Sequence, residues 1–251
     1  MLLRMLLLGT IVMTAATAKA ADTDTRVYEM RIYWAAEGKL DALNARFRDH
    51  TTKLFEKHGM TNVGYWVPLE NPDRKLIYFL AYPSRDAREK SWKDFLADPQ
   101  WQKAHRESEA NGKLVDKVES RFLQPTDYSP AVKPSNKGER IFVLRTYTTT
   151  PGNLGALNDR FRNHTLKLFE KHGMTNVVYW TLMSDQVGAD KTLVYILAHA
   201  SKEAADKSFA AFRSDPDWVA ARNASEAGGS LTEKDGVKSL FMRATDYSPI
   251  Q

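Results

Sequence analysis

Alternating apolar and polar residues predict a β-strand at residues 27–34. Residues 37–58 then carry apolar side chains every three or four positions, which is the spacing of an amphipathic helix. Gly59 follows at the position where helices commonly end, because glycine adopts the left-handed backbone conformation without strain. The pattern therefore predicts a strand followed by a helix that ends at Gly59.

The following residues predict the remaining elements of a small α+β unit. Ser84 suits the N-cap of a second helix that runs to about residue 96, and Asp98-Pro99 separates it from a shorter helix at residues 100–110. Three further strands are predicted at residues 63–67, 75–82 and 118–123. The order strand-helix-strand-strand-helix-strand is that of a ferredoxin-like fold.

The same pattern occurs twice. When the sequence is shifted by 114 positions, residues 44–66 lie on residues 158–180, and 19 of these 23 positions are identical. An internal repeat of this length indicates two copies of one structural unit. The first unit, the second unit and the short polar linker between them are predicted at residues 26–130, 140–249 and 131–139.

The predicted strands are apolar on both faces. In residues 75–82, Leu76, Tyr78 and Leu80 alternate with Ile77 and Phe79. One face can pack on the helices of its own unit, but the other face would stay exposed, which a soluble protein avoids for a patch of this size. Burial against the other unit's sheet solves the problem within one chain, and pairing between chains is the alternative. We therefore predict an α+β fold of two tandem ferredoxin-like β-α-β-β-α-β units that form one barrel.

Residues 1–20 have the composition of an export signal. Arg4 precedes a short apolar run at residues 5–13, and Ala18-Lys19-Ala20 fits a cleavage site. The run is too short to span a bilayer, which needs roughly 20 apolar residues. We expect a periplasmic or secreted protein that is cleaved after Ala20 and has no membrane span; an N-terminal anchor is the alternative.

Composition excludes several classes of function. The chain has no cysteine, so it forms no disulfide, no thiolate metal site and no cysteine nucleophile. Basic and acidic residues are interspersed around a formal charge of +5, with no basic stripe, so we expect no nucleic-acid partner. His50 and His58 are eight residues apart, which is not the spacing of a helical metal site. We therefore expect no metal.

Several segments resemble the NIPSNAP family. They are Tyr28-Glu29-Met30-Arg31-Ile32-Tyr33, the helix end Leu54-Phe55-Glu56-Lys57-His58-Gly59-Met60 with Gly64-Tyr65-Trp66, the stretch 92–101, and Thr126-Asp127-Tyr128-Ser129-Pro130. The second unit is similar but has Val178 for Gly64 and Phe209 for Trp92. The resemblance implies a dimeric α+β barrel. That fold also houses cofactor-free monooxygenases, haem-degrading and haem-dependent enzymes, and plain ligand binders, so it implies no single chemistry.

Two repeated features are candidates for a binding site. His50 and His164 lie beside the apolar stripe of their helices, where an inward imidazole could act as a base or a haem ligand, or simply form a structural hydrogen bond. Arg31 and Arg145 lie on strands, where a buried guanidinium binds a ligand carboxylate or pairs with a local acid. Glu29 is such an acid for Arg31, whereas Val143 replaces it beside Arg145.

Paired aromatic residues complete the candidate site. Tyr65-Trp66 and Tyr179-Trp180 either line a pocket or fill the core. With His50, Arg31, His164 and Arg145 they lead us to expect a small apolar or carboxylated ligand in a barrel pocket. A cofactor-free or haem-linked monooxygenase-type oxidoreductase is the second hypothesis, and an interaction or scaffold protein without a pocket is the third. A pseudo-dimer within the chain is expected, and a further homodimer is possible.

Overall fold

The computed structural model describes residues 24–251, so the export signal predicted at residues 1–20 lies outside the described residues. The first unit comprises β1 (Val27–Ala35), α1 (Leu40–Arg46), η1 (Phe47–Thr51), α2 (Thr52–Lys57), β2 (Thr61–Pro68), β3 (Lys75–Tyr82), α3 (Arg85–Ala97), α4 (Pro99–Ser108) and β4 (Val115–Pro125). The second unit comprises β5 (Ile141–Thr149), α5 (Leu154–Arg160), η2 (Phe161–Thr165), α6 (Leu166–Lys171), β6 (Thr175–Leu182), β7 (Thr192–His199), α7 (Lys202–Ser214), α8 (Pro216–Ser225) and β8 (Thr232–Ala244). The predicted α+β fold of two ferredoxin-like units is confirmed.

The helix ends follow the predicted local chemistry. The Ser84 hydroxyl accepts a hydrogen bond from the Ala87 backbone N–H, which caps α3 as expected. Asp98 caps α4 in the same way through the N–H of Gln100, and Pro99 occupies the first turn, where it loses no helical hydrogen bond. Gly59 has a φ of 77°, the left-handed conformation predicted for the residue that ends the long helix.

The long helix is not α-helical throughout. A π-helical turn, η1, interrupts it between α1 and α2, and η2 does the same in the second unit. In η1 the Thr51 hydroxyl bonds the carbonyl of Arg46, five residues earlier. A π-turn adds a residue to the helical period, so side chains beyond it no longer follow the 3.6-residue spacing from which their directions were predicted.

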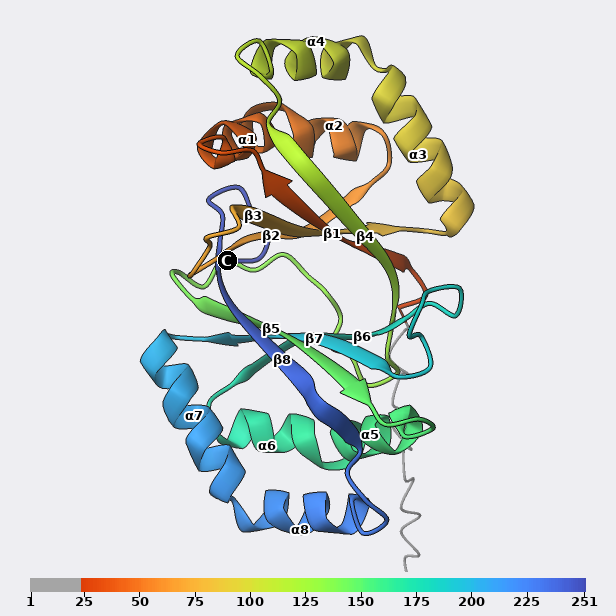
Figure 1. Cartoon of the computed structure of the whole chain (residues 1–251), viewed down its shortest axis with the longest axis vertical. Helices are drawn as coiled ribbons and strands as arrows, with labels where there is room; N and C mark the ends of the chain where they lie inside the picture. The colour runs from red at the N-terminus through yellow and green to blue at the C-terminus, as the bar shows by residue number, and fades with distance from the viewer. Residues whose placement is uncertain (1–23) are drawn as a thin grey trace, which may run out of the picture.

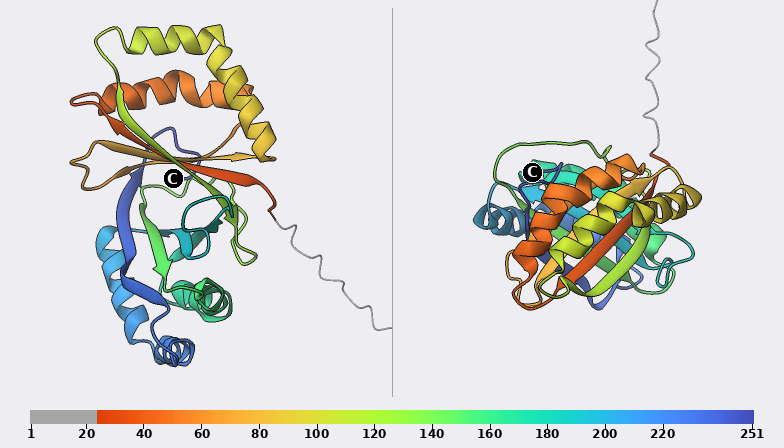
Figure 2. Two further views of the ribbon diagram at one scale, coloured as in Figure 1. Left: turned by 45° about the vertical axis from the view of Figure 1, so that its right-hand side comes forward. Right: turned by 90° about the horizontal axis from the view of Figure 1, so that it is seen from above.

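The eight strands close into a single barrel. Their order around it is β1-β3-β2-β8-β5-β7-β6-β4. Each unit contributes four adjacent strands, and the halves join where β2 pairs with β8 and β4 pairs with β6. Figure 1 shows the strands in the middle, with α1, α2 and α4 beyond one half and α5, α6 and α8 beyond the other. The left view in Figure 2 shows the same sequence of layers. The prediction that each unit buries its second sheet face against the other unit is confirmed.

The last residues of each unit also pack against the other unit. The Thr-Asp-Tyr-Ser-Pro segment of the second unit lies against β2, where the Tyr65 N–H donates to the Ser248 hydroxyl at 2.9 Å and the Thr245 N–H donates to the Tyr65 carbonyl at 3.0 Å. The Tyr247 hydroxyl donates to Asn44 at 2.7 Å. The first unit repeats these contacts on the second through Ser129, Thr126 and Tyr128. The repeated segment of each unit is thus hydrogen-bonded to the other unit, and these reciprocal contacts join the two units.

Three apolar clusters fill the molecule. One lies inside the barrel and draws side chains from both units. The other two lie between each half of the barrel and the helices that cover it. Within the described residues, no helix is long and apolar enough to cross a membrane.

Candidate functional site

The predicted histidines do not turn inward. His50 and His164 lie on the π-turns and are exposed. Each lines a shallow groove beside the last helix of its unit, of about 340 Å³ at His50 and about 610 Å³ at His164. The expected inward orientation is wrong because the π-turn rotates the helix at this point. Neither histidine meets the predicted arginines or aromatic residues.

His58 has a structural role. Its Nε2 lies 2.7 Å from Oδ2 of Asp98, the residue that caps α4, and His172 makes the same contact with Asp215. Hydrogen bonds from Lys57 and then His58 lower the pKa of the Asp98 carboxyl. The imidazole therefore ties the end of α2 to the start of α4.

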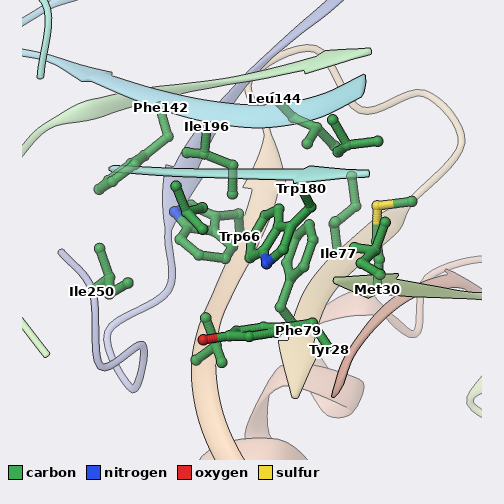
Figure 3. Close-up of a cluster of buried hydrophobic side chains, with 14 of the residues drawn as sticks. Tyr28, Met30, Trp66, Ile77, Phe79, Phe142, Leu144, Trp180, Ile196 and Ile250 are labelled. Carbon is green, nitrogen blue, oxygen red and sulfur yellow. The ribbon is translucent and has the colours of Figure 1, made fainter. Parts of the chain in front are cut away.

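The two predicted tryptophans lie inside the barrel. Trp66 and Trp180 are fully buried, and Figure 3 shows their rings gathered with Phe79 between strands of both units. The rings of Phe79 and Trp180 stack at 4.7 Å with an interplanar angle of 8°. These side chains fill the interior of the barrel, so the tryptophans belong to the core.

A glycine makes room for one of these rings. A Cβ placed on Gly64 would lie 2.1 Å from the Trp66 ring, which is closer than non-bonded atoms approach. The second unit has Val178 at the equivalent position, where Trp180 instead stacks on Phe79. The difference between the repeats at this position therefore follows from the packing of two large rings in one barrel.

Tyr65 and Tyr179 are also core residues. Both are fully buried between their sheet and the covering helices. The phenol of Tyr65 donates a hydrogen bond to Asn62, and that of Tyr179 donates to Asn176. The backbone N–H and carbonyl of each tyrosine form hydrogen bonds with the Thr-Asp-Tyr-Ser-Pro segment of the other unit. Both units keep this tyrosine because it packs in the core and its backbone bonds the other unit.

The first unit contains a pocket of about 730 Å³ between β1, β4 and the helices. This volume lies within the range of roughly 300–1,000 Å³ that is common for small-molecule sites. Its aromatic walls are Tyr33, Phe47, Phe55, Trp92, Phe95 and Trp101. Of the predicted residues, Arg31 alone lines it, so sequence reasoning found one residue of this site and missed the others.

A buried ion cluster forms one end of the pocket. Glu29 is 0% exposed and accepts hydrogen bonds from Arg31 Nη1 at 2.5 Å and from Arg88 Nε and Nη2 at 3.0 and 2.9 Å. The hydroxyls of Tyr82 and Ser120 donate to it at 3.0 and 2.6 Å. A buried carboxylate costs several kcal/mol unless it is fully paired, and five donors meet that requirement here.

The electrostatics of Glu29 follow from these contacts. Burial alone would raise the pKa of its carboxyl, but the hydrogen bonds from Arg88 and the charge of Arg31 outweigh burial and lower the pKa to about 2. Glu29 is thus a permanent anion, unsuited to act as a base near neutral pH. The Arg31 guanidinium lies 4.3 Å from the Trp92 ring centre, a cation–π contact that fixes this wall of the pocket.

A third guanidinium lies at the other end. Arg46 is buried, pairs with Glu109 at 3.1 Å and lies 5.3 Å from the ring centre of Trp101. Its Nε has no hydrogen-bond partner among the described residues. The pocket therefore has an aromatic middle with arginines at both ends.

The second unit departs from the first at one end of the equivalent region. Strand registers place Val143 at the position of Glu29, opposite Phe241 as Glu29 is opposite Phe122. The matched 13-residue helices α3 and α7 place Ala205 at the position of Arg88 and Phe209 at that of Trp92. His199 ends β7 where Tyr82 ends β3. Because Arg160 and Trp218 keep the contact of Arg46 and Trp101, the units differ mainly around the strand arginine.

Comparison with solved structures agrees with the barrel. A monooxygenase-like protein from Fusobacterium nucleatum is 10% identical with a TM-score of 0.55, and the match covers 88% of this chain and 92% of that chain. An anthrone oxidase-like protein is 13% identical with a TM-score of 0.55, covering 91% and 95%. At these identities the likeness shows the fold alone. The class is therefore a dimeric α+β barrel formed within one chain.

The family follows from the sequence itself. The NIPSNAP family model matches the chain twice, at residues 28–130 and 142–249. A NIPSNAP family protein from Agrobacterium tumefaciens is 27% identical with a TM-score of 0.38, and the match covers 42% of this chain and 97% of that chain. Among curated proteins no sequence matches. The chain belongs to the NIPSNAP family, with two tandem domains.

Proposed function

We propose that the protein is exported and binds a small molecule with an apolar body and a carboxylate in the pocket of the first unit. The observation that carries the proposal is the pocket itself, about 730 Å³ with aromatic walls and with arginines at both ends. Aromatic walls contribute most of the binding energy in such sites, and a few charged groups fix the orientation.

The charge of the lining favours an anion. Six basic side chains line the pocket against three acidic ones, and Glu29 behind it adds a fourth negative charge. Of the three arginines that line the pocket, Arg88 is the one whose partner is displaced most readily, because its Nη1 pairs at 3.1 Å with Glu89, which is 65% exposed. Exposed ion pairs of this kind contribute about 0–1 kcal/mol. A ligand carboxylate can therefore replace Glu89 at Arg88 with little loss.

Calorimetry with 2-naphthoate and 2-naphthalenemethanol tests the proposal. We expect the acid to bind and the alcohol, which has the same rings without the charge, to bind more weakly. Arg88→Ala introduces the residue of the second unit and should weaken naphthoate binding roughly 10-fold, because a charged hydrogen bond contributes about 1.5–3 kcal/mol. Arg222→Ala, on the exposed surface of α8, is the matched control. Equal affinity for acid and alcohol, or no effect of Arg88→Ala, would reject the carboxylate.

The predicted histidines give no support to a haem-linked oxidoreductase. His50 and His164 lie in grooves outside the pocket, and His58 is held by Asp98. His105 lines the pocket but is half exposed and lies 3.6 Å from Glu109. These residues do not fit a haem with an axial histidine. Absence of a Soret band after reconstitution with excess haem is the expected result, and a band lost in His105→Ala would contradict it.

Export is proposed from the sequence of residues 1–20, which resembles a secretory signal. Protein isolated from its own host should begin at Ala21. An intact N-terminal Met1 on the cytoplasmic protein would contradict this part of the proposal.

A further inference from the structure

The second unit keeps counterparts of three of the four groups that donate to Glu29, but it has lost the carboxylate that accepts from them. Across β5 and β8, Arg145 lies opposite Ser239, as Arg31 lies opposite Ser120 across β1 and β4. His199, a possible N–H donor, stands where the Tyr82 hydroxyl donates to Glu29. Three of the groups that surround Glu29 therefore have counterparts of the same hydrogen-bonding type. The carboxylate of Glu29 and its fourth partner, Arg88, have been replaced by the apolar side chains of Val143 and Ala205.

This loss leaves polar atoms without partners. His199 is 2% exposed, and neither of its ring nitrogens has a hydrogen-bond partner among residues 24–251. Arg145 Nε and the Tyr195 hydroxyl are likewise buried and unpartnered, whereas their counterparts Arg31 and Tyr78 bond each other at 2.9 Å. An unsatisfied buried polar group costs about 1–3 kcal/mol. The unsatisfied atoms of His199, Arg145 and Tyr195 therefore destabilise the second unit unless a ligand pairs with them.

Arg145 also lacks a charged partner among the described residues. No acidic side chain of the described residues forms an ion pair with it. Its Nη2 donates to the Tyr147 hydroxyl at 2.9 Å, and its guanidinium lies 5.4 Å from the Tyr147 ring centre and 4.9 Å from that of Phe209. On the helix side the surrounding side chains are apolar and smaller than in the first unit, since Ala205 replaces Arg88 and Phe209 replaces Trp92. An uncompensated guanidinium beside apolar side chains is suited to an anion that carries its own apolar group.

We propose that Arg145, His199 and Ser239 form a second site, which binds a small monocarboxylate at the place that the Glu29 carboxylate occupies in the first unit. The carboxylate accepts from the Arg145 guanidinium, from an imidazole N–H of His199 and from the Ser239 hydroxyl. Its short apolar tail lies toward Val143, Ala205 and Phe209. Arg145 is only partly buried, so the ligand meets it first, and contact with His199 requires the neighbouring side chains to move.

Sodium propionate, followed through the side-chain nitrogen resonances of His199, tests this site. Propionate should shift the His199 signal saturably, with a dissociation constant on the order of millimolar because the contacts are few. The double variant Val143→Glu/Ala205→Arg restores the first unit's own carboxylate and arginine, and it should lose the response. Arg222→Ala, on the exposed surface of the same unit, should keep it. The His199 signal reports on the second unit, so its response does not depend on naphthoate binding in the first.

Several results would overturn the site. A His199 signal that does not move with propionate does so directly, and so does an unchanged response in Val143→Glu/Ala205→Arg. An equal shift with sodium chloride or inorganic phosphate rejects a carboxylate in favour of any anion. Should the double variant fail to fold, Arg145→Gln, with folding checked by circular dichroism, takes its place and must also abolish the response.

Discussion

The Glu29 carboxylate lies 2.5 Å from Nη1 of Arg31, and this buried pair is present in the first unit alone, because Val143 replaces the acid in the second. Two units that share 19 of 23 residues over their central segment therefore differ in the surroundings of this arginine.

Removal of the Glu29 charge should destabilise the first unit strongly. Glu29→Gln leaves Arg31 and Arg88 without their buried counter-ion, and breaking a buried pair in this way costs about 3–5 kcal/mol. Urea unfolding measures the loss. The control Glu89→Gln, at an exposed pair, should change the free energy of unfolding by less than about 0.5 kcal/mol. Similar effects of both variants would contradict the assigned role of Glu29.

The stability of the second unit should fall at mildly acidic pH through His199. Burial, with a contribution from the Arg145 charge, lowers its pKa from 6.5 to about 4, with Asp206 acting in the opposite direction. Between these two values the unfolded chain binds a proton that the folded chain does not. The stabilisation is therefore complete above pH 6.5 and is lost as the pH falls towards 4, by roughly 2–3 kcal/mol.

His199→Phe should flatten this part of the pH profile of unfolding. His50→Gln, at an exposed histidine, should leave the profile unchanged. A His199→Phe protein that loses stability between pH 6.5 and 4 as steeply as the wild type would show that another group is responsible.

The barrel core should not tolerate the second unit's residue at Gly64. Gly64→Val places its Cβ against the Trp66 ring, and overpacking of this kind typically costs 1–3 kcal/mol or more. The reciprocal Val178→Gly creates no clash and loses only buried apolar surface. Thermal unfolding with tryptophan fluorescence should show the larger effect for Gly64→Val, and the reverse order would contradict the packing described for Trp66.

Much of the barrel was predictable, and its exceptions have physical reasons. Apolar side chains on both faces of Lys75–Tyr82 required a second sheet, because no unit has enough helices to cover both faces. The π-turns were not predictable, since Phe47–Thr51 carries no residue type that distinguishes a π-turn from an α-turn. This error alone misplaced His50 and His164.

The pocket was harder to predict than the fold. Arg88 lies on a helix rich in charged residues, where an arginine is expected to face solvent, so nothing in its own segment marked it. The signal was the contrast between units, Glu29 with Val143 and Trp92 with Phe209, which becomes informative once Arg88 and Ala205 are placed beside these pairs. Trp66 and Trp180 could not be assigned to core or pocket until the interior of the barrel was seen to be filled.

The joining of the units can be tested with the first unit alone. Residues 26–130 expressed separately should not remain a stable monomer, because the barrel-facing side of the sheet, including Tyr28 and Phe79, would be exposed. We expect dimers or aggregates in sedimentation or light-scattering measurements. The intact chain provides the control. A well-folded monomer of residues 26–130 would contradict the need for a second sheet.

The central claim, that a ligand binds between the helices and sheet of the first unit, is tested most directly by ¹⁹F NMR of protein labelled with 5-fluorotryptophan. The six tryptophans report on separate places, because Trp92 and Trp101 line the pocket whereas Trp66 and Trp180 lie inside the barrel. Addition of 2-naphthoate should shift the signals of Trp92 and Trp101 and leave those of Trp66 and Trp180 in place. Shifts confined to Trp66 and Trp180, or no shift at saturating naphthoate, would contradict the claim.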